Sequence, residues 1–142
     1  YFISRQLDGW QERRVAEQTA HPRMPEIAAG VGRLISRLHR AGVWMKDASP
    51  GNILWHTGPD GNMHFALVDI NRMDFDVHTP GILMRNFGRL FAGEAPTLAA
   101  ARAYAKDAGE DETSIEREAI RQRQLAARKF ARKQRLKKIL RI

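Results

Sequence analysis

The clearest pattern of apolar residues in the chain lies between residues 25 and 42. Apolar side chains recur there every three or four positions, at Ile27, Val31, Leu34, Ile35 and Leu38. This spacing places them on one face of an α-helix. Pro25 suits the first turn of such a helix, and Gly42 suits its end. The segment is therefore predicted to be an amphipathic helix.

Two short apolar segments follow, at residues 53–55 and 65–68, and the stretch between them is rich in turn residues. This arrangement predicts a β-hairpin, with Asp69 directly after its second strand. Before the amphipathic helix, residues 1–4 favour a short strand, and residues 10–20 favour a short polar helix.

The rest of the chain has helical patterns over about 82–92, then 96–108, and then from about residue 113. In the last helix one stripe is expected to hold apolar residues at Ile115, Ala119, Ala126 and Phe130, with Leu136 and Leu140 near it. The order is helix, loop, hairpin and several helices. It predicts an α+β fold that is mostly helical.

Composition limits the classes of protein to consider. The 142 residues are 43% hydrophobic and 28% charged, which is typical of one globular domain. The chain has no cysteine, so disulfides, thiolate metal sites and a cysteine nucleophile are excluded. No apolar run approaches the roughly 20 residues of a membrane span.

The formal net charge of +8 is unevenly distributed. Residues 113–142 hold 11 Lys and Arg against 2 Asp and Glu, whereas residues 1–112 are close to neutral. The basic character therefore belongs to the C-terminal helix alone. We divide the chain accordingly, into a body over 1–112 and a basic amphipathic helix over 113–142.

Two carboxylates and an amide occupy informative positions. Asp47 and Asn52 bracket a tight loop before the hairpin, and Asp69 follows its second strand. The hairpin brings Asn52 and Asp69 to the same edge, where their oxygens are the ligands that Mg²⁺ prefers. Asp47 in the same loop can accept a proton from a hydroxyl group. These residue types together are typical of a phosphoryl transferase.

The segment LHRAGVWMKDASPGNILW (38–55) resembles the catalytic loop of the protein-kinase-like fold and keeps its Asp-x-x-x-x-Asn spacing. LVDINR (67–72) is similar to the metal-binding strand end of that fold, and RNFGRL (85–90) to a later arginine-rich helix. The combination most resembles the bacterial lipopolysaccharide kinases that act on Kdo and core heptose. The resemblance covers roughly residues 1–108.

The resemblance implies the C-terminal lobe of a kinase, with residues 1–9 as the hinge strand. It implies that Asp47 is the catalytic base and that Lys46 contacts phosphate. Asn52 and Asp69 would bind Mg²⁺ and, through it, ATP. The implied reaction transfers the γ-phosphate of ATP to a hydroxyl of a lipid-linked sugar. The implied location is the cytoplasm, at the inner face of the bacterial inner membrane.

The sequence also departs from the kinase pattern. Met45 and Lys46 stand where a histidine and an arginine are usual, and Asn71 replaces the glycine two residues after the metal-binding aspartate. No glycine-rich loop, strand lysine or partner glutamate precedes the hinge, so the chain is expected to be an incomplete enzyme. A protein kinase and a catalytically inactive, pseudokinase-like binding module are the alternatives.

Each candidate residue has a purely structural alternative. Asp47 and Asn52 favour turns in any protein, and Lys46 and Arg72 can serve as ordinary ion-pair partners. His39 is expected to pack or cap at the end of the amphipathic helix. Asn86 is a candidate to brace the catalytic loop through hydrogen bonds.

The basic C-terminal helix has three interpretations. Its apolar stripe can pack on the body while its charges face solvent. Its charges can attract an anionic membrane surface, which the family resemblance favours. A basic-tailed nucleic-acid-binding protein is the third, although no aromatic platform for bases accompanies the charge.

Overall fold

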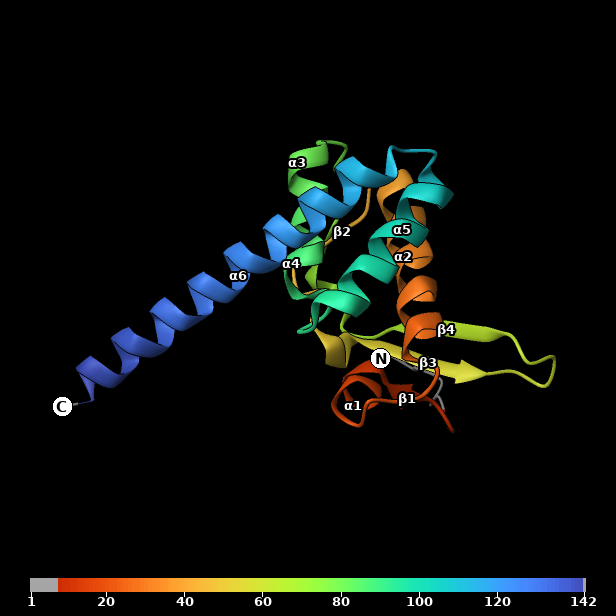
Figure 1. The fold of residues 1–142 in the computed structure, drawn as a ribbon, viewed down its shortest axis with the longest axis horizontal. Helices are drawn as coiled ribbons and strands as arrows, with labels where there is room; N and C mark the ends of the chain where they lie inside the picture. Colours follow the sequence, from red (N-terminus) through yellow and green to blue (C-terminus); the bar gives the residue numbers. More distant parts are fainter. Residues whose placement is uncertain (1–7, 142) are drawn as a thin grey trace.

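The computed structural model describes residues 8–141 as a mostly helical α+β fold (Figure 1). The strand predicted over residues 1–4, and most of the predicted hinge, lie outside the described residues. The helices are α1 (Arg13–Gln18), α2 (Met24–Arg40), α3 (Pro80–Leu83), α4 (Phe87–Leu90), α5 (Glu94–Ala108) and α6 (Glu112–Leu140). The strands are β1 (Gln11–Glu12), β2 (Trp44–Met45), β3 (Ile53–Thr57), β4 (Met63–Leu67) and β5 (Met73–Asp74).

The core forms where α2 packs against α5. The predicted apolar face of α2 is buried at Ile27, Val31 and Ile35, and small alanines of α5 face it. Gly32 permits this close approach, because a Cβ there would collide with the backbone of Ala100. Gly42 has a φ of 72° and follows the last turn of α2, so the predicted end of this helix is confirmed.

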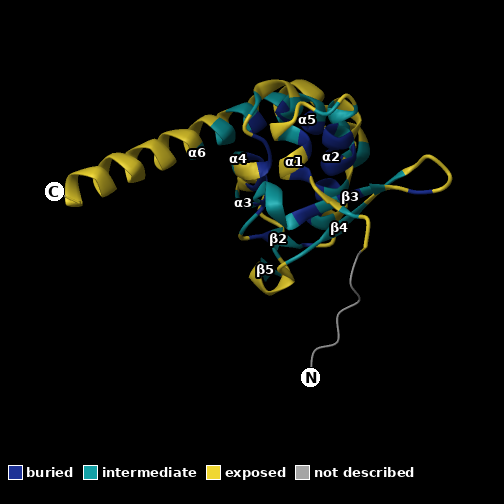
Figure 2. Cartoon of the chain, turned by 90° about the horizontal axis from the view of Figure 1, so that it is seen from below, coloured by how far each residue is buried: buried dark blue, intermediate teal, exposed yellow. Residues whose placement is uncertain are grey.

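The long helix α6 divides into a packed half and a projecting half. Its first turns lie on α4 and α5, where Ala119 is buried and Gly88 approaches the α6 backbone. Residues 127–141 are all exposed and extend away from the body (Figure 2). Phe130, predicted to share a packed stripe with Ala119, is 64% exposed. That part of the prediction is wrong because the body does not extend beneath the distal half of the helix.

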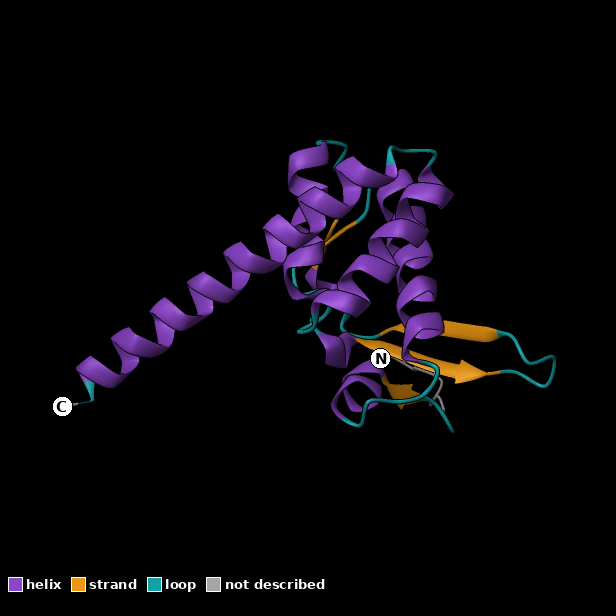
Figure 3. Ribbon diagram, in the orientation of Figure 1, coloured by secondary structure: helices purple, strands orange, loops and turns teal. Residues whose placement is uncertain are grey.

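Two small antiparallel sheets carry the loops between the helices (Figure 3). In the first, β3 and β4 form the predicted hairpin, with Ile53 opposite Leu67. The ring of Phe65 fills the space beside Gly30 of α2, where a Cβ would collide with it. The hairpin is thereby seated on α2, and the start of β3 and the end of β4 lie side by side.

The single helix predicted over residues 10–20 is only partly correct. Gln11 and Glu12 form β1, which pairs with β3 and places Gln11 opposite Trp55. This pairing satisfies backbone groups on the free edge of β3, and such tertiary pairing outweighs a weak local helical pattern. The helix α1 begins only at Arg13.

The helical segment predicted over residues 82–92 is confirmed up to Leu90, but it is not one regular α-helix. Two short helices, α3 and α4, are separated there by a 3₁₀ turn over Met84–Asn86. Met84 and Asn86 are both buried, and the Asn86 side chain bonds to the backbone before the candidate catalytic loop. The 3₁₀ turn thus connects two short α-helices, as is frequent for such turns, and its Asn86 side chain points into the body.

Candidate active site

The candidate catalytic loop between Asp47 and Asn52 is closed by its own hydrogen bonds. The Asn52 side chain donates from Nδ2 to the carbonyl oxygen of Asp47 at 3.0 Å. The backbone N–H of Ser49 donates to Oδ1 of Asp47 at 3.2 Å, and that of Asn52 donates to the carbonyl of Ser49 at 3.0 Å. The two residues that the spacing singles out are therefore held together, as a turn of this composition allows.

Asp69 lies at the same place because β4 ends beside the start of β3. The backbone N–H of Val68 donates to the carbonyl of Asn52 at 3.0 Å. Asp69 itself has a left-handed backbone conformation, with φ of 59° and ψ of 46°, and its residue is exposed. Such a conformation is uncommon for a residue other than glycine and is often found at functional sites.

The oxygen donors at this edge fit a magnesium ion. The Asn52 amide commits its Nδ2 to Asp47, which leaves Oδ1 free to face a cation. Among residues 8–141 Asp69 takes part in no ion pair. The same residues contain no group of three His, Cys, Asp or Glu side chains placed to hold a metal. A site of one carboxylate and one amide suits Mg²⁺, which completes its shell with water and substrate phosphates.

Two arginines hold the Asp47 carboxylate. Nη1 of Arg89 lies 3.3 Å from Oδ1, and Nη1 of Arg72 lies 3.8 Å from Oδ2. The Asp47 side chain is 19% exposed, whereas the arginine side chains are 60% (Arg72) and 62% (Arg89) exposed. Asp47 thus sits at the floor of the site with arginines at its rim.

Lys46 takes a different partner. Its Nζ lies 3.0 Å from Oδ1 of Asp74, and its backbone N–H donates to the carbonyl of Arg72 at 2.8 Å. Both contacts follow from the second small sheet, in which Trp44 of β2 lies opposite Asp74 of β5. Lys46, the predicted phosphate contact, therefore forms an ion pair with Asp74 in the structure. This agrees with the alternative that Lys46 is an ordinary ion-pair partner.

A buried chain of hydrogen bonds supports the loop from below. Asn86 donates from Nδ2 to the carbonyl of Met45 at 2.6 Å, which confirms the predicted brace. Its Oδ1 lies 3.0 Å from Nε2 of His39, and Nδ1 of His39 lies 2.9 Å from the Tyr104 hydroxyl. His39 is buried, as expected of a packing residue, but its link to Tyr104 had no signal in the sequence.

The direction of this chain is fixed by the Asn86 amide. Because Nδ2 is the donor to Met45, Oδ1 is an acceptor, and His39 must donate to it from Nε2. Nδ1 of His39 then accepts from the Tyr104 hydroxyl. Burial lowers the pKa of His39, although its hydrogen bond to Asn86 acts in the opposite direction. Burial also raises the pKa of Tyr104.

Two rim arginines were not among the predicted site residues. Arg89 was visible only as part of an arginine-rich segment, and nothing in its spacing points to Asp47. Arg14 of α1 lies over the loop at Gly51, where a Cβ would come within 2.5 Å of its Nη2. Their contacts with the loop depend on how α1 and α4 pack, which periodicity does not reveal.

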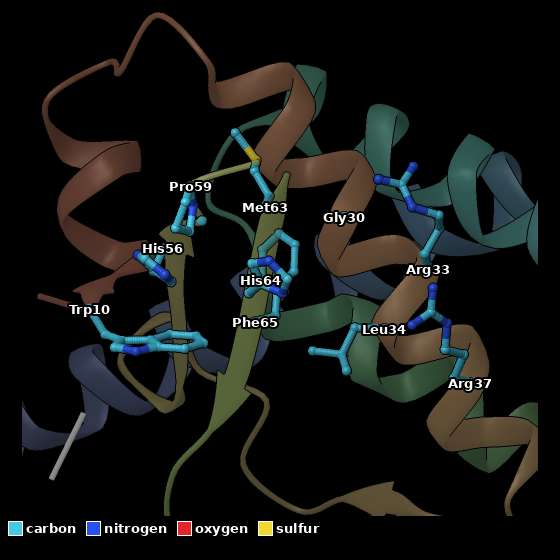
Figure 4. A pocket seen from close by; sticks show the side chains of 11 residues that line it. Trp10, Gly30, Arg33, Leu34, Arg37, His56, Pro59, Met63, His64 and Phe65 are labelled. Atoms are coloured by element: carbon cyan, nitrogen blue, oxygen red, sulfur yellow. The ribbon is translucent and has the colours of Figure 1, made fainter. Parts of the chain in front are cut away.

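A separate pocket of about 560 Å³ lies at the outer end of the hairpin (Figure 4). Trp10, His56 and His64 line it on the hairpin side, and Arg33 and Arg37 of α2 line it on the other. None of the predicted site residues lines this pocket.

The structure thus combines a mostly helical α+β body with a hairpin that follows a closed Asp-x-x-x-x-Asn loop and leads to an exposed aspartate. The model of the lipopolysaccharide kinase (Kdo/WaaP) family matches residues 2–90. The chain belongs to this family, as the sequence resemblance predicted.

A solved structure supports the fold. The chain is similar to WaaP in its complex with acyl carrier protein, with a TM-score of 0.66 and 18% sequence identity. The similarity covers 87% of this chain and 57% of that chain, so the present chain spans little more than half the length of that WaaP. No curated protein sequence gave a significant match. None of the helices described within residues 8–141 is long and apolar enough to cross a membrane.

Proposed function

We propose that this chain forms the catalytic lobe of an ATP-dependent kinase that phosphorylates a sugar hydroxyl of a lipid-linked lipopolysaccharide core. Membership of the family supports the class of enzyme. The observation that carries the chemistry is the junction at Asn52. One hydrogen bond ties its side chain to Asp47, and another ties its carbonyl to the residue before Asp69.

Each of these residues has a distinct role in the proposal. Asp47 accepts the proton of the attacking sugar hydroxyl, and its place on the closed loop orients that hydroxyl. Asn52 and Asp69 would hold Mg²⁺, which neutralises negative charge on the phosphates of ATP when it is bound. Lys46 contacts a phosphate by exchanging its present partner, Asp74.

The exchange of Asp69 for asparagine tests the metal role. In the full-length kinase Asp69→Asn should lower Mg²⁺-dependent transfer by at least about 100-fold, since the charge facing the metal is lost. Asp76→Asn is a matched control, because Asp76 is also exposed and also has a φ of 59°. The control should retain activity. Radiolabelled transfer from ATP to purified lipopolysaccharide measures both, and equal losses would contradict the assignment.

The role of Asp47 is tested by separating binding from turnover. Asp47→Ala should lower kcat by about 100-fold or more and leave the affinity for Mg²⁺-ATP within about twofold, because the carboxylate acts on the acceptor. Calorimetry and steady-state kinetics on the full-length kinase give the two quantities. A parallel loss of nucleotide affinity would show that Asp47 belongs to the nucleotide site instead.

We further propose that the distal half of α6 contacts anionic lipid headgroups, and so brings the lobe to its membrane-linked substrate at the inner face of the inner membrane. The projecting residues 127–141 contain eight basic and no acidic side chains. Each basic residue near an anionic surface contributes about 1 kcal/mol. The basic side chains surround the helix, so the attraction is electrostatic more than insertion of an apolar face.

Vesicle binding tests this contact. Removal of two distal charges in Lys137→Gln/Lys138→Gln should weaken binding to phosphatidylglycerol vesicles about 30-fold, from roughly 1 kcal/mol for each residue. Lys106→Gln/Arg117→Gln removes two exposed charges outside the projecting residues, one from α5 and one from the packed half of α6, and should leave binding nearly unchanged. A parallel titration with acyl carrier protein is included because the similar WaaP was solved with it. Binding to the carrier protein alone would contradict the membrane proposal.

A further inference from the structure

The β3–β4 hairpin leaves one edge of its sheet without a partner strand among the described residues. The sheet has the order β1-β3-β4, so β1 covers the far edge of β3 and β4 ends the sheet on the other side. The sequence of β4 is MHFAL, without the lysine or proline that often protects such an edge from other chains. An apolar edge strand of this kind can accept a further strand.

The register of the hairpin decides which backbone groups of β4 face outward. The N–H of Val68 donates to the carbonyl of Asn52 at 3.0 Å. Because bonded and non-bonded pairs alternate along an antiparallel ladder, Met63, Phe65 and Leu67 belong to the non-bonded pairs. Their N–H and C=O groups therefore point away from β3. Within residues 8–141, no backbone group outside the hairpin bonds to them.

The pocket at the outer end of the hairpin runs along this free edge. It lies between β4 and α2, and Met63 and Phe65 line it (Figure 4). A second pocket of about 420 Å³ shares Arg33 and Met63 with the first and continues to Gly61 at the hairpin tip. We call the two adjoining pockets the edge groove. A groove with free strand backbone along one side suits an extended peptide.

The edge groove also carries positive charge that has no partner in the described chain. Arg33 and Arg37 line it from α2, and both are exposed. Within residues 8–141 neither arginine takes part in an ion pair. Glu26 also lines the groove, but it is already paired with Arg23 at 2.7 Å. A ligand with acidic side chains would therefore complement this charge.

We propose that the free edge of β4 and the edge groove bind an extended acidic segment of a partner protein. The segment adds one strand to the sheet through main-chain hydrogen bonds with Met63 and Phe65. Alternate side chains of a strand point to the same face, so acidic residues at every second position can reach Arg33 and Arg37. None of the predicted catalytic or metal-binding residues lines the groove, so this binding does not depend on the proposed function.

Calorimetry with a designed peptide tests the charge requirement in the full-length kinase. The probe is a capped peptide of about seven residues that alternates glutamate and valine. It should bind saturably, and the same peptide with lysine in place of glutamate should not bind. Arg33→Gln/Arg37→Gln should weaken binding about tenfold, because two ion pairs are lost. Arg40→Gln is the matched control, since Arg40 is exposed on the same helix but lines neither pocket, and it should change the affinity less than about twofold.

Amide hydrogen exchange separates strand addition from simple attraction of charge. The bound peptide should slow exchange at Met63 and Phe65 at least about tenfold, because their N–H groups gain partners. His64 and Ala66 belong to pairs already bonded to β3 and should change less than about twofold. A peptide N-methylated at alternate positions keeps its charge but cannot complete the ladder, so it should bind at least about tenfold more weakly.

Several results would overturn the inference. The first is no saturable binding of the acidic peptide, and the second is equal binding of the lysine or N-methylated peptide. Equal losses in Arg40→Gln and the double variant would also overturn it. Protection of Met63 and Phe65 that rises with protein concentration, without peptide, would assign the edge to a second copy of the chain instead.

Discussion

The two sides of the candidate catalytic loop are held by different kinds of contact. Below it, the carbonyl of Met45 is held by Asn86, His39 and Tyr104 in a continuous hydrogen-bonded chain. Asn86 and His39 in this chain are buried. Above it, Asp47 meets two mostly exposed arginines at longer distances.

The two kinds of contact differ in the free energy needed to break them. Buried hydrogen bonds are costly to break because the freed groups cannot reach water. Exposed ion pairs are cheap to break because water replaces the lost partner. The buried side therefore holds the loop in position, whereas the exposed arginine contacts with Asp47 can be broken at little cost.

The largest expected effect comes from removing the centre of the buried chain. Asn86→Ala leaves the Met45 carbonyl and the His39 N–H without partners and should lower the free energy of unfolding by about 2–4 kcal/mol. Asn71→Ala, at an exposed residue, should change it by less than about 0.5 kcal/mol. Urea unfolding measures both. If the two variants lost equal stability, the buried chain would not be the support described here.

The pH dependence of stability sharpens the comparison. Burial lowers the pKa of His39, so the unfolded chain binds a proton more readily as the pH falls below about 6.5. The free energy of unfolding should therefore decrease from pH 7.5 to pH 5.5, by at most about 1.4 kcal/mol per pH unit. His39→Gln should remove this dependence, and the exposed His78→Gln should retain it. A slope that survives in His39→Gln would assign it to another group.

Tyr104→Phe should have a smaller effect. The variant keeps the ring, which packs at its edge against Phe87, and removes only the hydroxyl that donates to His39. The loss of one buried hydrogen bond should lower the free energy of unfolding by about 1 kcal/mol. Double-mutant analysis with Asn86→Ala should give a loss smaller than the sum, because both residues act through His39. Strict additivity would show that the chain is not continuous.

The smallest stability effect is expected on the upper side. Arg72→Gln and Arg89→Gln should each change the free energy of unfolding by less than about 0.5 kcal/mol. Thermal and urea unfolding measure this change. A loss above about 1.5 kcal/mol would place these arginines with the structural support.

The sequence predicted the parts of the fold that local spacing controls. The face of α2 and the β3–β4 hairpin were predicted because their apolar periods are regular and their ends carry glycine or turn residues. The predictions were inaccurate for segments in which long-range contacts outweigh the local pattern. Gln11 and Glu12 form a strand, and the segment around Asn86 is a 3₁₀ turn between two short α-helices, with the Asn86 side chain bonded to Met45.

The contacts of the candidate site were also predictable only where local sequence controls them. The junction of Asp47, Asn52 and the end of β4 was predictable because the two halves of a hairpin must meet at one edge. The contacts of Arg14 and Arg89 with the loop were not, since each requires the packing of a separate helix. Lys46 was visible in the motif, but its pairing with Asp74 depends on the two-residue sheet of β2 and β5.

The most direct test of the account is an anomalous-scattering crystal structure of the full-length kinase with Mn²⁺ and a non-hydrolysable ATP analogue. We expect a metal peak about 2.1 Å from Oδ1 of Asn52 and from a carboxylate oxygen of Asp69, with the γ-phosphate toward Asp47. A metal held elsewhere, with the Asp69 side chain turned away from Asn52, would contradict it.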